Sequence, residues 1–231
     1  MGFFFLILSK FLINNNYNTK KRIKMDSLKF EKIKLPEPDK KKGKPIMECF
    51  KNRKSTREYN SSKKLSLQQI SELLYCAYGN SHKNQMNQLL KTAPSAVALF
   101  PLEFYLLFKE GIFYFDPEKN ELIPCVEGDH RDKIATGQNF VKDAHFNLLI
   151  FANMKKKAPN ERADQILNMD PSYRIKFACL DAGHCSQNVL LYCASEDLKC
   201  VVRASGDSGY FKKLLKKESD YEYIISICIG A

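Results

Sequence analysis

The chain has 231 residues, of which 44% are hydrophobic and 27% are charged. This composition excludes a polar disordered chain and a bundle of membrane helices, and the length suffices for one main domain with a sizeable core. The net charge of +11 is concentrated at the front, because residues 1–64 contain 18 basic and 6 acidic side chains whereas residues 65–231 contain 19 and 20. A basic leading segment before a neutral body favours a solvated arm over a nucleic-acid-binding face.

The first residues combine an apolar run with a basic stretch. Residues 3–8 are apolar, but Lys10 follows closely and the run is too short to cross a bilayer, which takes about 20 apolar residues. Met25 lies after the basic stretch and is a second candidate start of translation. Residues 1–24 are interpreted, in order of preference, as an untranslated extension, a membrane anchor or a cleaved leader. Residues 1–45 as a whole are predicted to form a basic, largely extended arm, because prolines and lysines interrupt any apolar periodicity.

The predicted domain, residues 46–231, begins with two helices. A short helix is expected at 46–52, and Ser66 with Gln69 forms a capping box that opens a second helix. Apolar residues recur at helical spacing from Leu67 to Tyr78, and the glycine that follows is the expected end of this helix.

Beyond the second helix the pattern changes. Residues 80–92 are polar and are interpreted as a loop or lid, and the turn residues Glu110 and Gly111 separate two strand-like runs, which predicts a hairpin. The later elements are expected in this order: strands at 104–108, 112–115 and 121–126, a helix at 130–141, a strand at 145–154, a long helix at 174–195, a strand at 198–202, a helix at 211–215 and a strand at 221–229. Separated helices and strands around a hairpin indicate the α+β class.

Eight cysteines are present, and none belongs to a CxxC pair. Cys179, His184 and Cys185 lie close in sequence, but no second pair of ligands completes a zinc site, so no metal site is predicted. Most of the cysteines lie in apolar or helical patterns. They are interpreted as buried thiols in a reducing compartment, and a cytoplasmic location is expected.

Three segments have compositions that suit a ligand. Residues 53–57 contain three cations and two hydroxyls, a phosphate-binding composition in which an extended backbone would direct alternate side chains to one side. Residues 92–104 are rich in small side chains, which let a planar ligand approach the backbone. Residues 203–207 form a small-residue turn whose N–H groups can hold an anion. By composition alone, an ordinary solvated turn is the preferred interpretation of residues 53–57, and the other two segments can also be interpreted as ordinary turns.

Taken together and in this order, the three segments resemble the flavin-dependent nitroreductase superfamily, and the resemblance covers residues 46–230. Residues 53–57 look like the family's first flavin motif, and residues 205–207 stand where the family has its glycine turn. Residues 92–103 look like the version found in the azoline (peptide thiazoline/oxazoline) dehydrogenase branch, and residues 181–188 look like the central helix of that branch.

The resemblance implies a nitroreductase-like α+β fold with a central, mostly antiparallel sheet flanked by helices, and a homodimer with FMN at the interface. It implies a ping-pong cycle in which NADH or NADPH reduces FMN and a nitroaromatic, quinone or similar small acceptor reoxidises it, with flavin N5 carrying the hydride and no catalytic side chain. The implied cofactor-binding residues are Arg53, Lys54, Ser55 and Arg57 at the phosphate, ribityl chain and pyrimidine edge, Pro94, Ser95 and Ala96 along the ring from the other subunit, and Ser205 and Gly206 near N5. Nucleic acid is not an expected partner, and a membrane is expected only if residues 1–13 form an anchor.

Departures from the family pattern leave alternatives open. The basic segment that commonly follows the last strand is missing, so phosphate binding would rest on residues 53–57, and Ser205 stands where a glycine is common, with Arg203 beside it. The alternatives are a flavin-binding protein without turnover, an azoline-type dehydrogenase of a modified peptide, and an interaction protein whose basic arm contacts nucleic acid or an anionic membrane.

Overall fold

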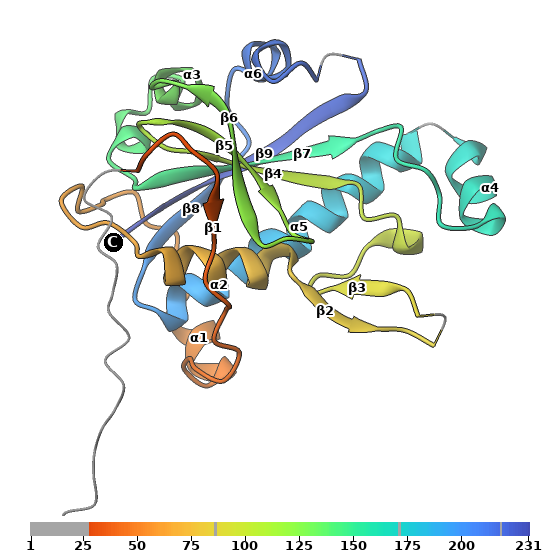
Figure 1. Cartoon of the computed structure of the whole chain (residues 1–231), viewed down its shortest axis with the longest axis horizontal. Coiled ribbons are helices and arrows are strands. Elements are labelled where there is room, and N and C mark those ends of the chain that lie inside the picture. Colours follow the sequence, from red (N-terminus) through yellow and green to blue (C-terminus); the bar gives the residue numbers. More distant parts are fainter. Residues whose placement is uncertain (1–27, 86, 171, 218) are drawn as a thin grey trace, which may run out of the picture.

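The computed structural model describes residues 28–85, 87–170, 172–217 and 219–231. Within these ranges, seven strands form one sheet in the order β1-β6-β5-β4-β7-β9-β8, and every described pairing is antiparallel (Figure 1). The strands of this sheet are β1 (Ile33–Lys34), β4 (Leu102–Leu107), β5 (Gly111–Asp116), β6 (Glu121–Glu127), β7 (Phe146–Asn153), β8 (Lys199–Arg203) and β9 (Tyr221–Gly230). The predicted hairpin at residues 110–111 is confirmed as the turn between β4 and β5.

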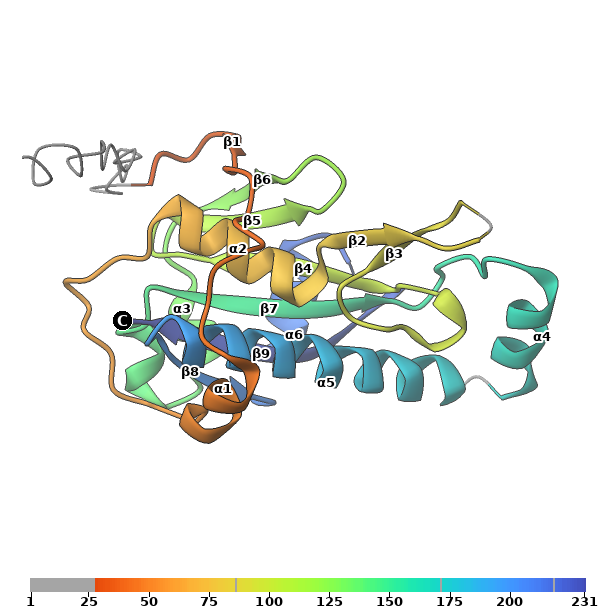
Figure 2. The same ribbon diagram turned by 90° about the horizontal axis from the view of Figure 1, so that it is seen from below.

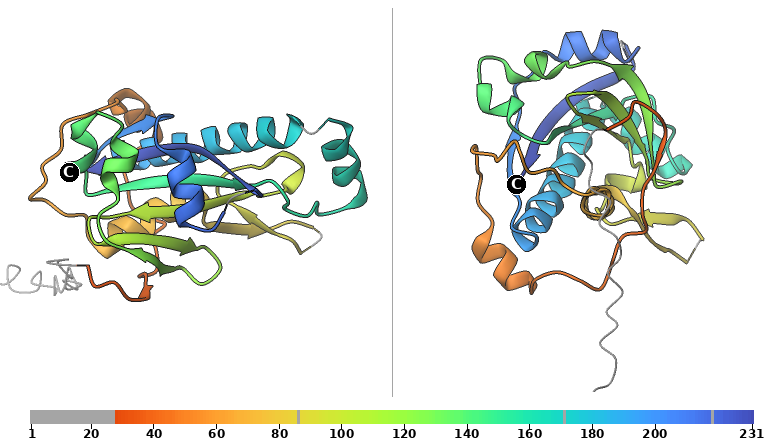
Figure 3. Two further views of the ribbon diagram at one scale, coloured as in Figure 1. Left: turned by 90° about the horizontal axis from the view of Figure 1, so that it is seen from above. Right: turned by 60° about the vertical axis from the view of Figure 1, so that its left-hand side comes forward.

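Helices cover both faces of the sheet. Successive side chains of a buried strand point to opposite sides, so both faces are apolar and both must be shielded from water. On β4, Phe104 and Leu106 pack with α2 and α5, whereas Tyr105 and Leu107 belong to a second core with α3 and α6 (Figures 1 and 3). The helices are α1 (Ile46–Asn52), α2 (Leu67–Tyr78), α3 (Arg131–Ala135), α4 (Glu161–Met169), α5 (Ser172–Ser195) and α6 (Ser208–Leu214), and the 3₁₀ turns are η1 (Ala96–Ala98) and η2 (Asn139–Lys142). The α+β expectation, with a mostly antiparallel sheet flanked by helices, is confirmed.

Local signals place the ends of α2. The capping box of α2 is formed as predicted, since Gln69 N–H donates to Ser66 Oγ at 3.2 Å and Ser66 N–H donates to Gln69 Oε1 at 3.0 Å. The single helix predicted at 130–141 is wrong. The chain leaves the helical conformation at Thr136 and Gly137, whose φ angles are +47° and +85°, so α3 and η2 are separate elements.

The segment interpreted as a loop or lid, residues 80–92, is a second small sheet instead. Strands β2 (Asn80–Lys83) and β3 (Leu89–Lys91) pair in an antiparallel hairpin that projects from the end of α2 (Figure 2). Polar side chains suit this position, because all four residues of β2 are partly or fully exposed. Helix α4 was not predicted from the sequence.

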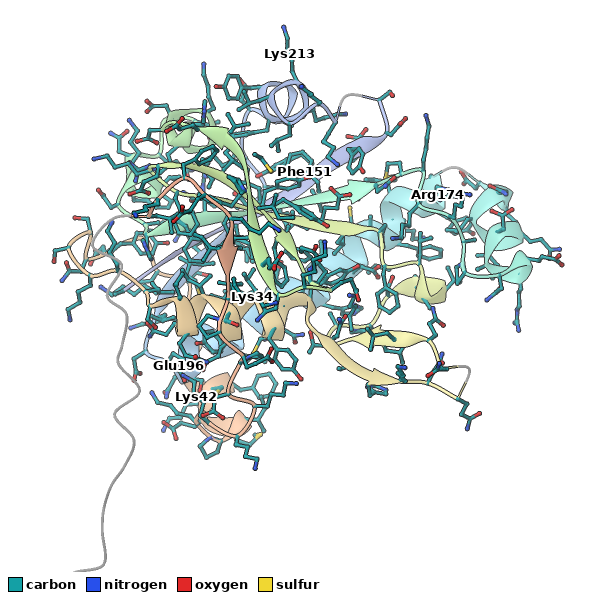
Figure 4. The ribbon with its side chains drawn as sticks, viewed as in Figure 1. Lys34, Lys42, Phe151, Arg174, Glu196 and Lys213 are labelled. Carbon is teal, nitrogen blue, oxygen red and sulfur yellow. The ribbon has the colours of Figure 1, made fainter. Side chains whose placement is uncertain are left out.

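The described part of the leading arm, residues 28–45, lies on the body of the same chain. Leu35 is 2% exposed within the core, and β1 pairs with β6. Lys42 binds the carboxylates of Glu72 (2.6 Å) and Glu196 (2.8 Å), and Figure 4 shows Lys42 beside Glu196. Apolar packing and ion pairs dock this segment on the fold. The predictions for residues 1–24 lie outside the described residues.

The described ranges contain free cysteines but neither a membrane-spanning helix nor a metal-binding cluster. No helix there is both long enough and apolar enough to span a bilayer, and no group of three or more His, Cys, Asp or Glu side chains is arranged to hold a metal ion. All eight cysteines are free thiols, and five of them are buried.

Candidate functional site

The segment that follows α1 runs along the edge strand β8. Thr56 N–H donates to the Cys200 carbonyl at 2.9 Å, which fixes the segment to the strand. Lys54, Thr56 and Glu58 line one wall of a groove of about 810 Å³, and the end of α5 with the start of β8 forms the other wall. Lys54 therefore borders the groove between this segment and α5.

Arg53, Ser55 and Arg57 do not line this groove. Ser55 and Arg57 are exposed, and Arg53 is half-buried. Among the residues that the structure describes, none forms an ion pair with Arg53, Lys54 or Arg57. Unpaired cations beside a free hydroxyl match the donors that a phosphate group requires.

A tight turn follows β8 and leads into α6. Gly206 has no room for a side chain, because a Cβ atom there would lie 2.4 Å from Ile134 Cδ1 and 3.2 Å from the Tyr223 hydroxyl. In the described part of the chain, the backbone N–H groups of Ser205 and Gly206 donate no hydrogen bond, whereas that of Asp207 donates to a carbonyl of α3 at 2.9 Å. The turn therefore presses against α3 and keeps two N–H groups available to a ligand.

Arg203, the unexpected charge beside this turn, has a structural explanation. Its guanidinium is 6% exposed and donates to the carbonyls of Ile134 (2.8 Å) and Ala135 (3.0 Å) and to Gln138 Oε1 (2.9 Å). Carbonyls at a helix C-terminus lack partners within the helix and favour a cation. Arg203 therefore closes the end of α3, and it also donates to the Ser205 hydroxyl at 3.3 Å.

The small-residue segment, in contrast, is held by the central helix. The Ser95 hydroxyl donates to the Asp181 carboxylate, and Ala96 N–H donates to the same carboxylate at 3.1 Å. Asp181 is 2% exposed, and burial raises the pKa of its carboxyl against the lowering effect of these two hydrogen bonds. Pro94 is exposed at the start of the segment.

One chain brings two of the three segments together and leaves the third apart. Residues 53–57 and the turn at 205–206 share the β8 edge, since Cys200 and Ser205 are five residues apart and therefore at most about 18 Å apart. Residues 94–96 lie farther along α5, beside Asp181, toward the end of the helix where β2 and β3 project (Figures 1 and 2). Along that helix, Asp181 and the groove-lining Ala194 are separated by about 20 Å, from 13 residues at 1.5 Å each.

The predictions from the sequence gave no role to Asp181. A signal was present, because Asp181 falls on the buried stripe of α5 together with Ala178, Ala182 and Cys185. A carboxylate at such a position is seldom fully buried unless it has partners. The sequence did not show that those partners are Ser95 and Ala96, about 85 residues earlier.

Several solved structures share this fold. The crystal structure described as a "putative nitroreductase" from Ralstonia eutropha JMP134 is 32% identical, with a TM-score of 0.73, and the match covers 87% of this chain and 89% of that one. The Escherichia coli microcin synthetase McbBCD complex with truncated pro-MccB17 is 19% identical (TM-score 0.61, 79% and 71% covered), and a "putative nitroreductase" in complex with FMN from Desulfovibrio desulfuricans is 18% identical (TM-score 0.52, 82% and 87% covered). The last two show likeness of fold alone.

The sequence comparisons agree with the fold. A curated protein of Methanocaldococcus jannaschii, named "Putative nitroreductase MJ1384", is 30% identical over 173 residues, which are 71% of this chain and 80% of that protein. The model of the Nitroreductase family matches residues 50–231. These residues contain the groove, the Gly206 turn and the segment held by Asp181. The expected nitroreductase-like fold is confirmed, and the chain belongs to the nitroreductase family.

Proposed function

We propose that this protein is a homodimeric, FMN-dependent oxidoreductase whose cofactor binds to residues 46–231. The observation that carries the proposal is the β8 edge, where unpaired cations of residues 53–57 and the free N–H groups of the Gly206 turn lie on one sheet margin. A binding site for a ring that carries a phosphate group needs cations at the phosphate end and neutral hydrogen-bond donors at the ring end. Membership of the nitroreductase family supports FMN as that ligand.

The residues along the β8 edge would bind different parts of the cofactor. Arg53, Arg57 and Ser55 would bind the phosphate and ribityl chain and place positive charge at the pyrimidine edge, where reduction builds up negative charge. Lys54, which borders the groove, would add charge from that side. The N–H groups of the turn at 205–206 would orient the ring. When bound, FMN supplies the hydride chemistry that protein side chains lack.

A second copy of the chain would complete the site. Residues 94–96 lie too far from the β8 edge to cover a ring that is bound there by the same chain. In addition, two helices expose large apolar side chains. Ile46, Met47 and Phe50 on α1 and Leu180 on α5 are 53% to 74% exposed. Exposed apolar patches of this kind mark interaction surfaces. Pairing through α1 and α5 would bury these side chains and would bring residues 94–96 of one copy to the edge of the other.

The substrates follow from the chemistry of the proposed cofactor. NADH or NADPH would donate hydride, and after its departure a nitroaromatic, quinone or similar small acceptor would occupy the same place and take up the electrons. Alternate occupation of one site gives ping-pong kinetics.

The first experiment is an absorbance spectrum of the purified protein, followed by titration with NADH or NADPH without air. Oxidised flavin absorbs at about 370 and 450 nm, and both bands should bleach on reduction. A protein that is colourless and takes up no added FMN would refute the proposal. Bound flavin that no nicotinamide reduces would instead support the alternative of a flavin-binding protein without turnover.

Charge-removing variants test the assigned residues. Arg53→Gln and Arg57→Gln should each weaken FMN binding about 10- to 100-fold, the value of one charge-assisted hydrogen bond, and should affect riboflavin less because riboflavin has no phosphate. Lys63→Gln removes the same charge from an exposed position outside the segment and is the matched control. Equal losses for all three variants would show that only overall charge matters.

A further inference from the structure

One buried carboxylate fixes the loop formed by residues 94–100. Asp181 accepts hydrogen bonds from the Ser95 hydroxyl and, at 3.1 Å, from Ala96 N–H. The Oγ atom of Ser95 in turn accepts a hydrogen bond from Phe100 N–H at 2.8 Å. Asp181 therefore holds the start of the loop directly and its end through Ser95.

This loop needs an anchor because its backbone is strained. Val97, Ala98 and Phe100 have φ angles of +49°, +53° and +48°, in the left-handed region where a Cβ atom clashes with the backbone. The β-branched Val97 is the least suited of the three. Such conformations persist only where the surrounding structure holds them from several directions.

A carboxylate is a costly anchor, so a purely structural role does not explain it well. Asp181 lies among small and apolar side chains on the inner face of α5, and burial raises the pKa of its carboxyl. Well-packed apolar groups are often as stable as a buried ionic contact, or more so. The two hydrogen bonds to Asp181 instead fix the orientation of the loop backbone, whereas apolar packing would allow several orientations.

We infer that Asp181 is a positioning residue of the cofactor site, because it sets the shape of the loop 94–100 that lines the flavin ring across the subunit interface. This inference rests on the proposed function. It also reassigns the expected role of Ser95 and Ala96: their hydroxyl and N–H donors are already bound to Asp181, so the loop contacts the ring through its shape and through Pro94.

The test compares the binding of two ligands to the full-length protein. Asp181→Ala should weaken the binding of FMN and of riboflavin by the same factor, about 10- to 100-fold, because the loop contacts the ring that both ligands share. Asp181→Asn should lose less affinity for both flavins, since its amide oxygen can still accept the hydrogen bond from Ala96 N–H. The visible circular dichroism of the bound flavin, which reports the surroundings of the ring, should change in both variants.

Ser186→Ala is the matched control, because Ser186 is a buried hydroxyl on the same helix that donates to the Ala182 carbonyl at 2.6 Å and does not contact the loop. Its affinities and flavin spectrum should equal those of the wild type. Ser95→Ala should weaken ring binding on its own, and adding it to Asp181→Ala should have little further effect, because both changes break one network. If Asp181→Ala fails to fold by far-ultraviolet circular dichroism, Asp181→Asn and Ser95→Ala provide the test.

The outcomes separate the two proposals. A wild-type protein that binds neither flavin would overturn the proposed function and this inference together. A wild type that binds both, with Asp181 and Ser95 variants that bind equally well and keep the same flavin spectrum, would overturn the inference alone. Loss of FMN binding with riboflavin binding intact would also overturn it, because the effect of Asp181 would then lie at the phosphate.

Discussion

Protonation of His145 should make the fold sensitive to acid. The imidazole is 6% exposed, its Nδ1 accepts Leu65 N–H at 3.0 Å, and the ring packs against Phe108 and Phe146. Burial, with the nearby charge of Lys64, lowers the pKa of His145 from 6.5 to about 3. Because the folded-state pKa is depressed, the unfolded chain binds a proton below pH 6.5 that the folded chain does not bind until about pH 3. Stability is therefore full above pH 6.5 and is lost as the pH falls.

The size of this loss follows from the two pKa values. Each pH unit between them costs about 1.36 kcal/mol, so lowering the pH from 7 to 4.5 should reduce the free energy of unfolding by about 2.5 kcal/mol through His145 alone. Urea unfolding followed by far-ultraviolet circular dichroism suits the measurement, because the chain has no tryptophan to report on unfolding.

The variant His145→Asn isolates this contribution. Its side-chain oxygen can still accept Leu65 N–H but does not titrate, so the difference between pH 7 and pH 4.5 should shrink by about 2.5 kcal/mol, whatever the lost ring contacts do to stability at pH 7. His82→Asn removes an exposed histidine and should behave as the wild type does. Equal pH dependence in His145→Asn and the wild type would refute the reasoning.

Three further changes test local features. Gly206→Ala should lower stability by about 1–3 kcal/mol in thermal unfolding, because its Cβ would lie 2.4 Å from a side chain of α3, and an unchanged melting temperature would show that the turn can relax. Val97→Gly should raise stability to urea by about 1 kcal/mol, since glycine accepts φ +49° without strain, whereas a loss would mean that the valine side chain contributes more packing than strain. Lys42→Met should cost about 1 kcal/mol in urea unfolding, because Lys42 is itself solvent-exposed and Glu72 still accepts from Gln68 and Tyr192. Lys41→Met, which removes an exposed lysine that forms no ion pair with the described residues, should cost little.

Interactions within a few residues explain the elements that the sequence predicted correctly. The capping box of Ser66 and Gln69 and the turn at Gly111 depend on neighbours in the chain, so the same local geometry forms wherever the fold places them. The helix predicted at 130–141 failed for the opposite reason. Arg203, on a strand 68 residues after Ala135, binds the last carbonyls of α3 and stabilises its end.

In the candidate site, too, some features follow from the local sequence and others from contacts between distant residues. The sequence alone determined the residue types at the site, because three cations and two hydroxyls between Arg53 and Arg57 suit a phosphate whatever surrounds them. Only the tertiary structure showed that these cations form no ion pair with the described residues, that Lys54 borders the groove, and that Asp181 holds the loop 94–100. Pairing and orientation depend on groups that are distant in sequence, and those groups meet only when the sheet and α5 pack together.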